Sequence, residues 1–191
     1  MLAGELYDPS DEELLALRSK CHALCLKYNQ TSEEDAELRR GFLREMGLRL
    51  GENVYLQGPL FFDYGRFISI GDNTYANFNL TILDVCPVSI GKNVFMGTGV
   101  TIVTPLHPMR YQDRNMYINE KGCLTDKEYG KPITIGDNCW IASNVTICGG
   151  VTIGAGSVIG AGSVVTRSIP ANSFAVGNPC KVVRQIPNDG E

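Results

Sequence analysis

The stretch ITIGDNCWIASNVTICGGVTIGAGSVIGAGSVVTR, residues 133–167, carries an aliphatic residue at every sixth position. These aliphatic residues are Ile135, Ile141, Ile147, Ile153, Ile159 and Val165. Amphipathic helices return an apolar residue every three or four positions and half-buried strands every two, so a period of six indicates a chain that turns a corner every six residues. The residue after each aliphatic is mostly small, which suits tight corners between stacked coils. The spacing therefore predicts a triangular parallel β-helix with about 18 residues per coil.

The same phase recurs upstream, at Ile70, Ala76 and Ile82, and again at Ile90, Met96 and Ile102. We therefore expect the repeat to begin near Ile68, with two residues of slack around Cys86 and Pro87, where one step is eight. The step from Ile102 to Ile135 is 33, or six plus 27. This predicts a long insertion over about 104–131, and long insertions in repeat proteins concentrate on functional loops.

Two short helices are predicted before the repeat. Ser10 and Glu13 have the form of a capping box, and a helix over about 11–28 follows at helical apolar spacing. A second helix ends near Gly47 and has two alternative caps, Thr31 with Glu34 or Ser32 with Asp35. The fold class is thus mainly β. Its expected parts are an N-terminal helical segment (1–50), the β-helix with its insertion (51–185) and a C-terminal tail (186–191).

Composition and charge exclude several classes of function. The chain has 191 residues, 43% of them hydrophobic, a formal net charge of −4 and no basic patch for nucleic acid. Residues 138–166 carry no charge, but Gly, Ser, Thr and Asn recur and the period of six continues, so we expect coils and no membrane span. The first residues are acidic and lack a basic start before an apolar stretch, which predicts a cytoplasmic protein.

The seven cysteines form no CxxC pair, which suits reduced, buried thiols. Cys21 and Cys25 share a helix face beside His22, a pattern that could indicate a metal. Structural zinc requires four ligands, and the companions are missing, so we favour packing.

The insertion contains His107, one of two histidines, in the sequence TPLHP (104–108). Prolines on both sides restrict the backbone and would hold the imidazole in a fixed direction. A lone loop histidine is by default a solvated side chain. Its place in the largest interruption of the repeat favours catalysis, since imidazole is the usual general base near neutral pH.

Further motifs bear on function: AGELY (3–7), YANFNLT (75–81), GKPITIG (130–136), NCWI (138–141) and GNPCKVVR (177–184). Together with TPLHP they resemble the maltose and galactoside O-acetyltransferases of the hexapeptide-repeat family, over nearly the whole chain. The resemblance implies a left-handed β-helix assembled as a homotrimer, with active sites between subunits. It also implies acetyl-CoA as co-substrate, a sugar as acceptor and no required metal.

Carried over residue by residue, the resemblance makes His107 the general base and Asn77 a residue that orients the acceptor hydroxyl. The backbone N–H of Ser143 would stabilise the thioester oxyanion. Asp8, Asp63 and Asp84 would lie in the acceptor region, and Trp140, Ala161, Thr166, Arg167 and Lys181 along the CoA. The chain turns basic directly after its uncharged run, so Arg167, Lys181 or Arg184 is expected to meet CoA phosphates.

One position departs from the family pattern. Asp63 stands where the galactoside enzymes have a serine, and an ionised carboxylate accepts hydroxyl hydrogens but cannot donate one. The acceptor therefore need not be a galactoside. The insertion is also longer than in the galactoside branch, which favours the maltose branch.

Other interpretations remain open. Asn77 and Ser143 are also the polar residues that such corners often carry, Trp140 could be a plain surface residue, and the basic residues could be solvated charges. Another acceptor, an amino sugar, serine or an antibiotic, is the main alternative, and a non-catalytic scaffold is a weaker one. Zinc catalysis through three histidines is disfavoured, because only two are present and His22 is expected on a helix far from the coils.

Overall fold

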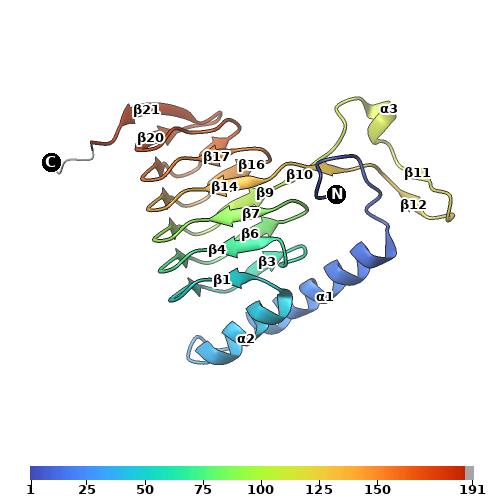
Figure 1. Cartoon of the computed structure of the whole chain (residues 1–191), viewed down its shortest axis with the longest axis horizontal. Helices are drawn as coiled ribbons and strands as arrows, with labels where there is room; N and C mark the ends of the chain where they lie inside the picture. Colours follow the sequence, from blue (N-terminus) through green and yellow to red (C-terminus); the bar gives the residue numbers. More distant parts are fainter. Residues whose placement is uncertain (188–191) are drawn as a thin grey trace.

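The computed structural model describes residues 1–187, and it shows coils stacked along one axis (Figure 1). Two helices lie at the base of the stack, and an insertion extends from its side. Residues 188–191 of the predicted tail lie outside the described residues. Within residues 1–187, no helix has the length and apolar composition that a membrane span requires.

Each coil contributes one short strand to each of three parallel sheets, as predicted. Sheet I contains β1 (Arg49–Leu50), β4 (Ile68–Ile70), β7 (Val88–Ile90), β14 (Ile133–Ile135) and β17 (Thr152–Ile153). Sheet II contains β2 (Tyr55–Leu56), β5 (Tyr75–Ala76), β8 (Phe95–Met96), β15 (Trp140–Ile141), β18 (Val158–Ile159), β20 (Ser173–Val176) and the antiparallel β21 (Lys181–Gln185). Sheet III contains β3 (Leu60–Phe62), β6 (Leu80–Leu83), β9 (Thr101–Val103), β16 (Thr146–Cys148) and β19 (Val164–Val165).

The period of six places one aliphatic residue of each strand inside the stack. Ile147, for example, is fully buried and pairs in register with Ile102 below it and Val165 above it. Burying such a side chain contributes roughly 1.5–3 kcal/mol relative to leaving it exposed. The corners are correspondingly tight, since a Cβ atom at Gly154 would lie 2.3 Å from the backbone nitrogen of Ala171. Larger residues cannot occupy that corner without moving the next coil.

The predicted start of the repeat near Ile68 is wrong. β1 pairs in parallel with β4, β2 with β5 and β3 with β6, so a complete coil precedes that residue. Its core positions, Leu50, Leu56 and Phe62, keep the period of six. A step of eight then separates Phe62 from Ile70, as it does between the next two coils, and this second slack step conceals the first coil in the sequence.

The two predicted helices are present as α1 (Glu12–Asn29) and α2 (Ala36–Met46). The predicted cap on Ser10 is wrong: Asp11 is the N-cap, and its carboxylate accepts the N–H groups of Glu13 and Leu14. Asp35 precedes α2 without a side-chain cap bond, and Gly47 ends it in the left-handed conformation.

α1 packs along β3, and Cys21 and Cys25 are buried there, each with its sulfur facing the carbonyl oxygen of Phe62. The packing role expected for these cysteines is what the structure shows. Arg39 of α2 joins the helices to the first coil, because its guanidinium lies 4.6 Å from the Tyr28 ring and 5.7 Å from the Tyr55 ring.

The insertion leaves the stack after β9 and returns at β14. It contains β10 (Pro105–Leu106), α3 (Tyr111–Arg114), β11 (Tyr117–Ile118), β12 (Leu124–Thr125) and β13 (Tyr129–Gly130). β10 pairs antiparallel with β13, and β11 with β12, so the insertion forms a double-stranded arm (Figure 1). The N-terminal segment lies against this arm, where Tyr7 and Glu128 form an antiparallel bridge.

Candidate active site

A cavity of about 610 Å³ lies where α1, the ends of β3 and β6, the N-terminal segment and the insertion meet. This volume is in the range of pockets that hold small ligands. Its wall combines apolar side chains with charged ones. The charged or titratable residues of the wall are Arg18, His22, Asp63, His107, Asp126 and Glu128.

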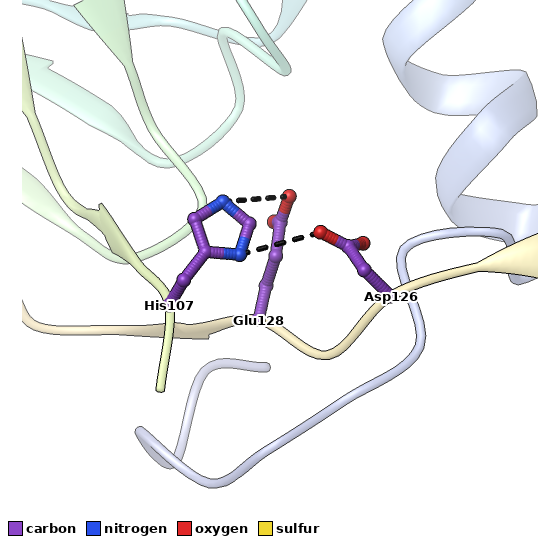
Figure 2. Close-up of side chains that lie close together, drawn as sticks. All are labelled: His107, Asp126 and Glu128. Atoms are coloured by element: carbon purple, nitrogen blue, oxygen red, sulfur yellow. Dashed lines mark ion pairs between the residues drawn. The ribbon is translucent and has the colours of Figure 1, made fainter. Parts of the chain in front are cut away.

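The antiparallel pairing of the insertion fixes where His107 lies. Leu106 pairs with Tyr129, so the next residues along the two strands, His107 and Glu128, are brought side by side. The His107 Nδ1 atom lies 3.3 Å from Asp126 Oδ2, and its Nε2 atom lies 4.0 Å from Glu128 Oε1. Figure 2 shows the imidazole between the two carboxylates. A carboxylate beside an imidazole orients the ring and stabilises the cation that forms when it accepts a proton.

The carboxylate of Glu128 is itself held by Tyr7. The Tyr7 hydroxyl donates to Glu128 Oε2 at 2.6 Å, and the two backbones exchange N–H···O bonds of 2.8 and 3.2 Å. Burial, and then the neighbouring Glu128 carboxylate, raise the pKa of Tyr7, so its hydroxyl remains a donor at neutral pH. The N-terminal segment thus fixes one wall of the imidazole site.

His107, Asp126 and Glu128 place one imidazole nitrogen and two carboxylate oxygens within 4.8 Å of one another. Such a donor set can accept a proton and can also coordinate a divalent cation. The prediction that no metal is required therefore stays a prediction.

Asp8 connects the N-terminal segment to the arm. Its Oδ1 atom accepts bonds from the Ser10 hydroxyl and the Thr125 hydroxyl, both at 2.7 Å, and its Oδ2 atom accepts from the Asn119 amide at 2.8 Å. These bonds, led by that from Ser10, lower the pKa of Asp8 and keep it ionised. The structure gives Asp8 a bonding role in holding the arm, and its contact with a sugar stays a prediction.

Asp63 follows β3 directly and lines the cavity, as the acceptor prediction requires. Its Oδ1 atom lies 3.4 Å from His22 Nε2. The expectation that His22 lies far from the coils is therefore wrong, because α1 packs on β3 and carries His22 to the cavity wall. Burial raises the pKa of Asp63, while the hydrogen bond to His22 lowers it.

Asp84 is fully buried behind the cavity. Its two oxygens accept the backbone N–H groups of Tyr64 at 2.9 Å and Phe67 at 3.3 Å, which fixes the corner between β3 and β4. Burial raises the pKa of Asp84 to about 6 in spite of these bonds. Its two neighbours in the sequence, Leu83 and Val85, line the cavity, whereas Asp84 itself does not.

Asn77, Trp140, Ser143 and Ala161 gather at another corner, between sheets II and III. Ala76 and Ile141 both pair with Met96. Asn77, which follows Ala76, and Ser143, which comes two residues after Ile141, therefore lie on the same corner of the stack. Trp140 points out of sheet II and is 56% exposed. Gly162 N–H donates to the Ser143 carbonyl, which places Ala161 one coil above Ser143.

The length of the sheet III strands separates this corner from His107. Asn77 precedes β6 and Ser143 precedes β16, so both lie where the sheet III strands begin. The insertion that carries His107 leaves after β9, where these strands end. Thr166 and the exposed Arg167 follow β19, so they also lie where the sheet III strands end. One copy of the chain therefore does not bring Asn77 and Ser143 to His107.

Lys181 and Arg184 lie on β21, which adds to the last coil of sheet II. Both are exposed, and the Arg184 guanidinium lies 5.8 Å from the Phe174 ring. Both therefore lie on the last strand of the stack, and their contact with CoA stays a prediction.

Several residues of the site were missed in the sequence. Asp126 and Glu128 are two residues apart and directly precede β13. Only the pairing of β10 with β13 reveals that they flank His107. Tyr7 belongs to the AGELY motif, which marked the segment but not the hydroxyl. Arg18 carries no motif or spacing that marks it in the sequence, and only the packing of α1 on β3 shows that it reaches the cavity.

Comparisons with known proteins agree with this architecture. Residues 1–46 match the maltose acetyltransferase hexapeptide capping motif, and residues 132–167 match the bacterial transferase hexapeptide with six repeats. The galactoside O-acetyltransferase of Escherichia coli K12 is 42% identical over 96% of this chain and 86% of its own length.

Two solved structures are similar over nearly their whole length. A maltose O-acetyltransferase from Clostridium difficile 630 has a TM-score of 0.88 at 40% identity, covering 98% of this chain and 95% of that one. A galactoside acetyltransferase in complex with coenzyme A has a TM-score of 0.87 at 42% identity, covering 97% and 88%. This chain therefore belongs to the hexapeptide-repeat family of maltose and galactoside O-acetyltransferases.

Proposed function

We propose that this protein transfers the acetyl group of acetyl-CoA to a hydroxyl of a sugar of the maltose, glucose or galactoside type, with His107 as general base. The observation that carries the proposal is the His107 imidazole, held between two carboxylates in the wall of a cavity of ligand size. Family membership supports the reaction class, and a relative with coenzyme A bound supports the acetyl donor.

The contacts of His107 assign its two nitrogens. The Nδ1 atom faces the carbonyl oxygen of Lys127 at 3.3 Å, and a carbonyl can only accept a hydrogen bond. Nδ1 therefore carries the proton in the neutral ring, and Nε2 is the base. The Glu128 carboxylate near Nε2 stabilises the imidazolium that forms during the reaction.

Transfer is direct in this proposal. The acceptor hydroxyl gives its proton to His107 Nε2 while its oxygen attacks the thioester carbonyl, forming a tetrahedral oxyanion next to the Ser143 backbone N–H. Asn77 orients the acceptor. Collapse of the intermediate breaks the carbon–sulfur bond, and the CoA sulfur leaves as a thiol after it takes up the proton from His107.

The proposal includes a homotrimer with sites between subunits. His107 and the corner that carries Asn77 and Ser143 lie at opposite ends of the sheet III strands, so a second copy would complete the site. Sheet II also presents an outward column of register partners, Tyr55, Tyr75, Phe95 and Trp140, and exposed aromatic columns are typical of interfaces. Light scattering should report three chain masses, and a fully active monomer would contradict the shared site.

Binding of the nucleotide end is assigned to the basic residues of the last coils. Thr166 and Arg167 at one edge, with Lys181 and Arg184 on β21, would bind CoA phosphates, and Trp140 and Ala161 would contact the rest of its arm. The cytoplasm is the compartment that we infer, because all seven cysteines are free thiols.

The experiment that tests this function is a screen of acceptors with release of the CoA thiol as readout. Glucose, maltose and methyl galactosides should be acetylated, and His107→Ala should slow the release about 10²–10⁴-fold. Activity confined to amino sugars, serine or antibiotics would support the alternative acceptors. Binding of acetyl-CoA without transfer to any acceptor would support the scaffold.

A further inference from the structure

His22 and Asp63 form a pair at the cavity wall, and the proposed reaction gives His22 no role. The His22 Nε2 atom lies 3.4 Å from Asp63 Oδ1, and the side chains are 54% and 20% exposed, respectively. The packing of Cys21 and Cys25 against the Phe62 carbonyl fixes α1 over β3, and this holds His22 beside Asp63. The pair is therefore a product of the helix–coil contact.

The charges around Asp63 come from three directions. Arg18 and His22 face it from α1, and the buried Asp84 of the next coil lies close to it. The Tyr64 hydroxyl, which accepts a hydrogen bond from Arg18, and the thiols of Cys21 and Cys25 are also close. Across the same cavity lie His107, Asp126 and Glu128. Burial opposes ionisation of Asp63, and His22 and Arg18 favour it.

A carboxylate that accepts a bond from His22 on Oδ1 retains acceptor capacity on Oδ2. We propose that His22 is a positioning residue: its Nε2–H fixes the Asp63 carboxylate so that Asp63 accepts a hydroxyl hydrogen of the sugar, and the pair thereby sets acceptor affinity. This inference rests on the proposed function. The pair should bind a sugar that donates a hydroxyl at this point of the cavity more tightly than an analogue that lacks that hydroxyl.

The first test compares His22→Ala, His22→Gln and Asp63→Asn, with Lys27→Ala as the matched control on α1. Dissociation constants for maltose and methyl β-galactoside, measured by calorimetry, should rise about tenfold in His22→Ala, since a hydrogen bond to a charged group is lost. The carboxamide of His22→Gln can still donate and should recover part of the affinity. The affinity for acetyl-CoA should not change, and Lys27→Ala should equal the wild type.

The second test separates positioning from a merely structural role. Adding His22→Ala to Asp63→Asn should weaken sugar binding no further, because the two residues act as one unit. Carboxyl NMR should show the pKa of Asp63 higher in His22→Ala than in the wild type, and the acid limit of sugar binding should move to higher pH with it.

The outcomes are distinguishable from those of the proposed function. Sugar binding and an Asp63 titration that are unchanged in His22→Ala would overturn the positioning role even in a fully active enzyme. A wild type that binds maltose and releases no thiol would overturn the acetyl transfer, and the binding data would still decide on His22. Additive effects of the two substitutions would also overturn the proposal.

Discussion

In the coils, each core side chain packs against its register partners in the neighbouring coils. The insertion, in contrast, is held by a segment that lies more than a hundred residues earlier in the sequence. Ile82, for example, lies between Phe62 and Ile102 in one ladder, 20 positions from each. Glu128 is held by Tyr7, 121 positions before it. The coils are thus a repeated structure that supplies stability, and the insertion is a single structure that supplies charged groups. The two regions should respond differently to substitution.

The largest expected effect is on the chemistry of the insertion. His107→Ala should lower kcat about 10²–10⁴-fold, the usual range for a lost general base, while KM for acetyl-CoA and the free energy of unfolding change little. Steady-state kinetics and urea unfolding measure the two quantities. A fall in stability that matches the fall in rate would mean that the insertion also supports the fold.

The exposed Cys123 of the same insertion provides the matched control. Cys123→Ser should retain most of the activity, since direct transfer needs no thiol nucleophile. Mass spectrometry of enzyme incubated with acetyl-CoA alone should find no acetyl group on the protein. An adduct on Cys123 that disappears when sugar is added would replace the direct mechanism by a covalent one.

The second effect concerns the coils. Ile147→Ala should lower the free energy of unfolding by about 2–5 kcal/mol, because it leaves a cavity in a fully buried ladder. Ile118→Ala, in the arm, removes the same atoms from a side chain that is 62% exposed. It should change the free energy of unfolding by less than about 0.5 kcal/mol. Urea titrations of both variants make the comparison. Equal losses would show that the arm is part of the cooperative core.

The third effect concerns Asp84, which is fully buried in the coils. Burial raises its pKa to about 6, above the value of 3.8 for an unhindered aspartate. The folded state therefore binds this proton more tightly, so the contribution to stability is complete below pH 3.8 and is lost as pH rises through about 6. Relative to Asp84→Asn, the wild type should lose about 3 kcal/mol of stability over this window. A difference between the two proteins that does not vary with pH would contradict the titration.

The smallest effect tests the contact that holds the insertion. Tyr7→Phe removes the hydroxyl that donates to Glu128 and should lower kcat about tenfold, equivalent to about 1.4 kcal/mol. Tyr111→Phe, at an exposed tyrosine of α3, is the control and should behave as the wild type. Unchanged kinetics in Tyr7→Phe would mean that the backbone bridge alone fixes Glu128.

The same contrast explains what could be predicted from the sequence. The coils were predictable because their period is local, and even the overlooked first coil keeps the phase in Leu50, Leu56 and Phe62. The partners of His107 were not predictable, because the antiparallel register of β10 and β13 is set across some twenty residues that have no period. The His22–Asp63 contact depends on how a helix docks on a sheet, which no spacing records.

The bridge between Tyr7 and Glu128 also has a consequence for the time course of folding. A contact that spans 121 positions closes a long loop, and the entropy of closure is not repaid until the intervening coils have formed. We therefore expect the sheets to assemble before His107 acquires its carboxylate neighbours. On refolding, the circular dichroism signal of the strands should recover first, and enzymatic activity should appear later.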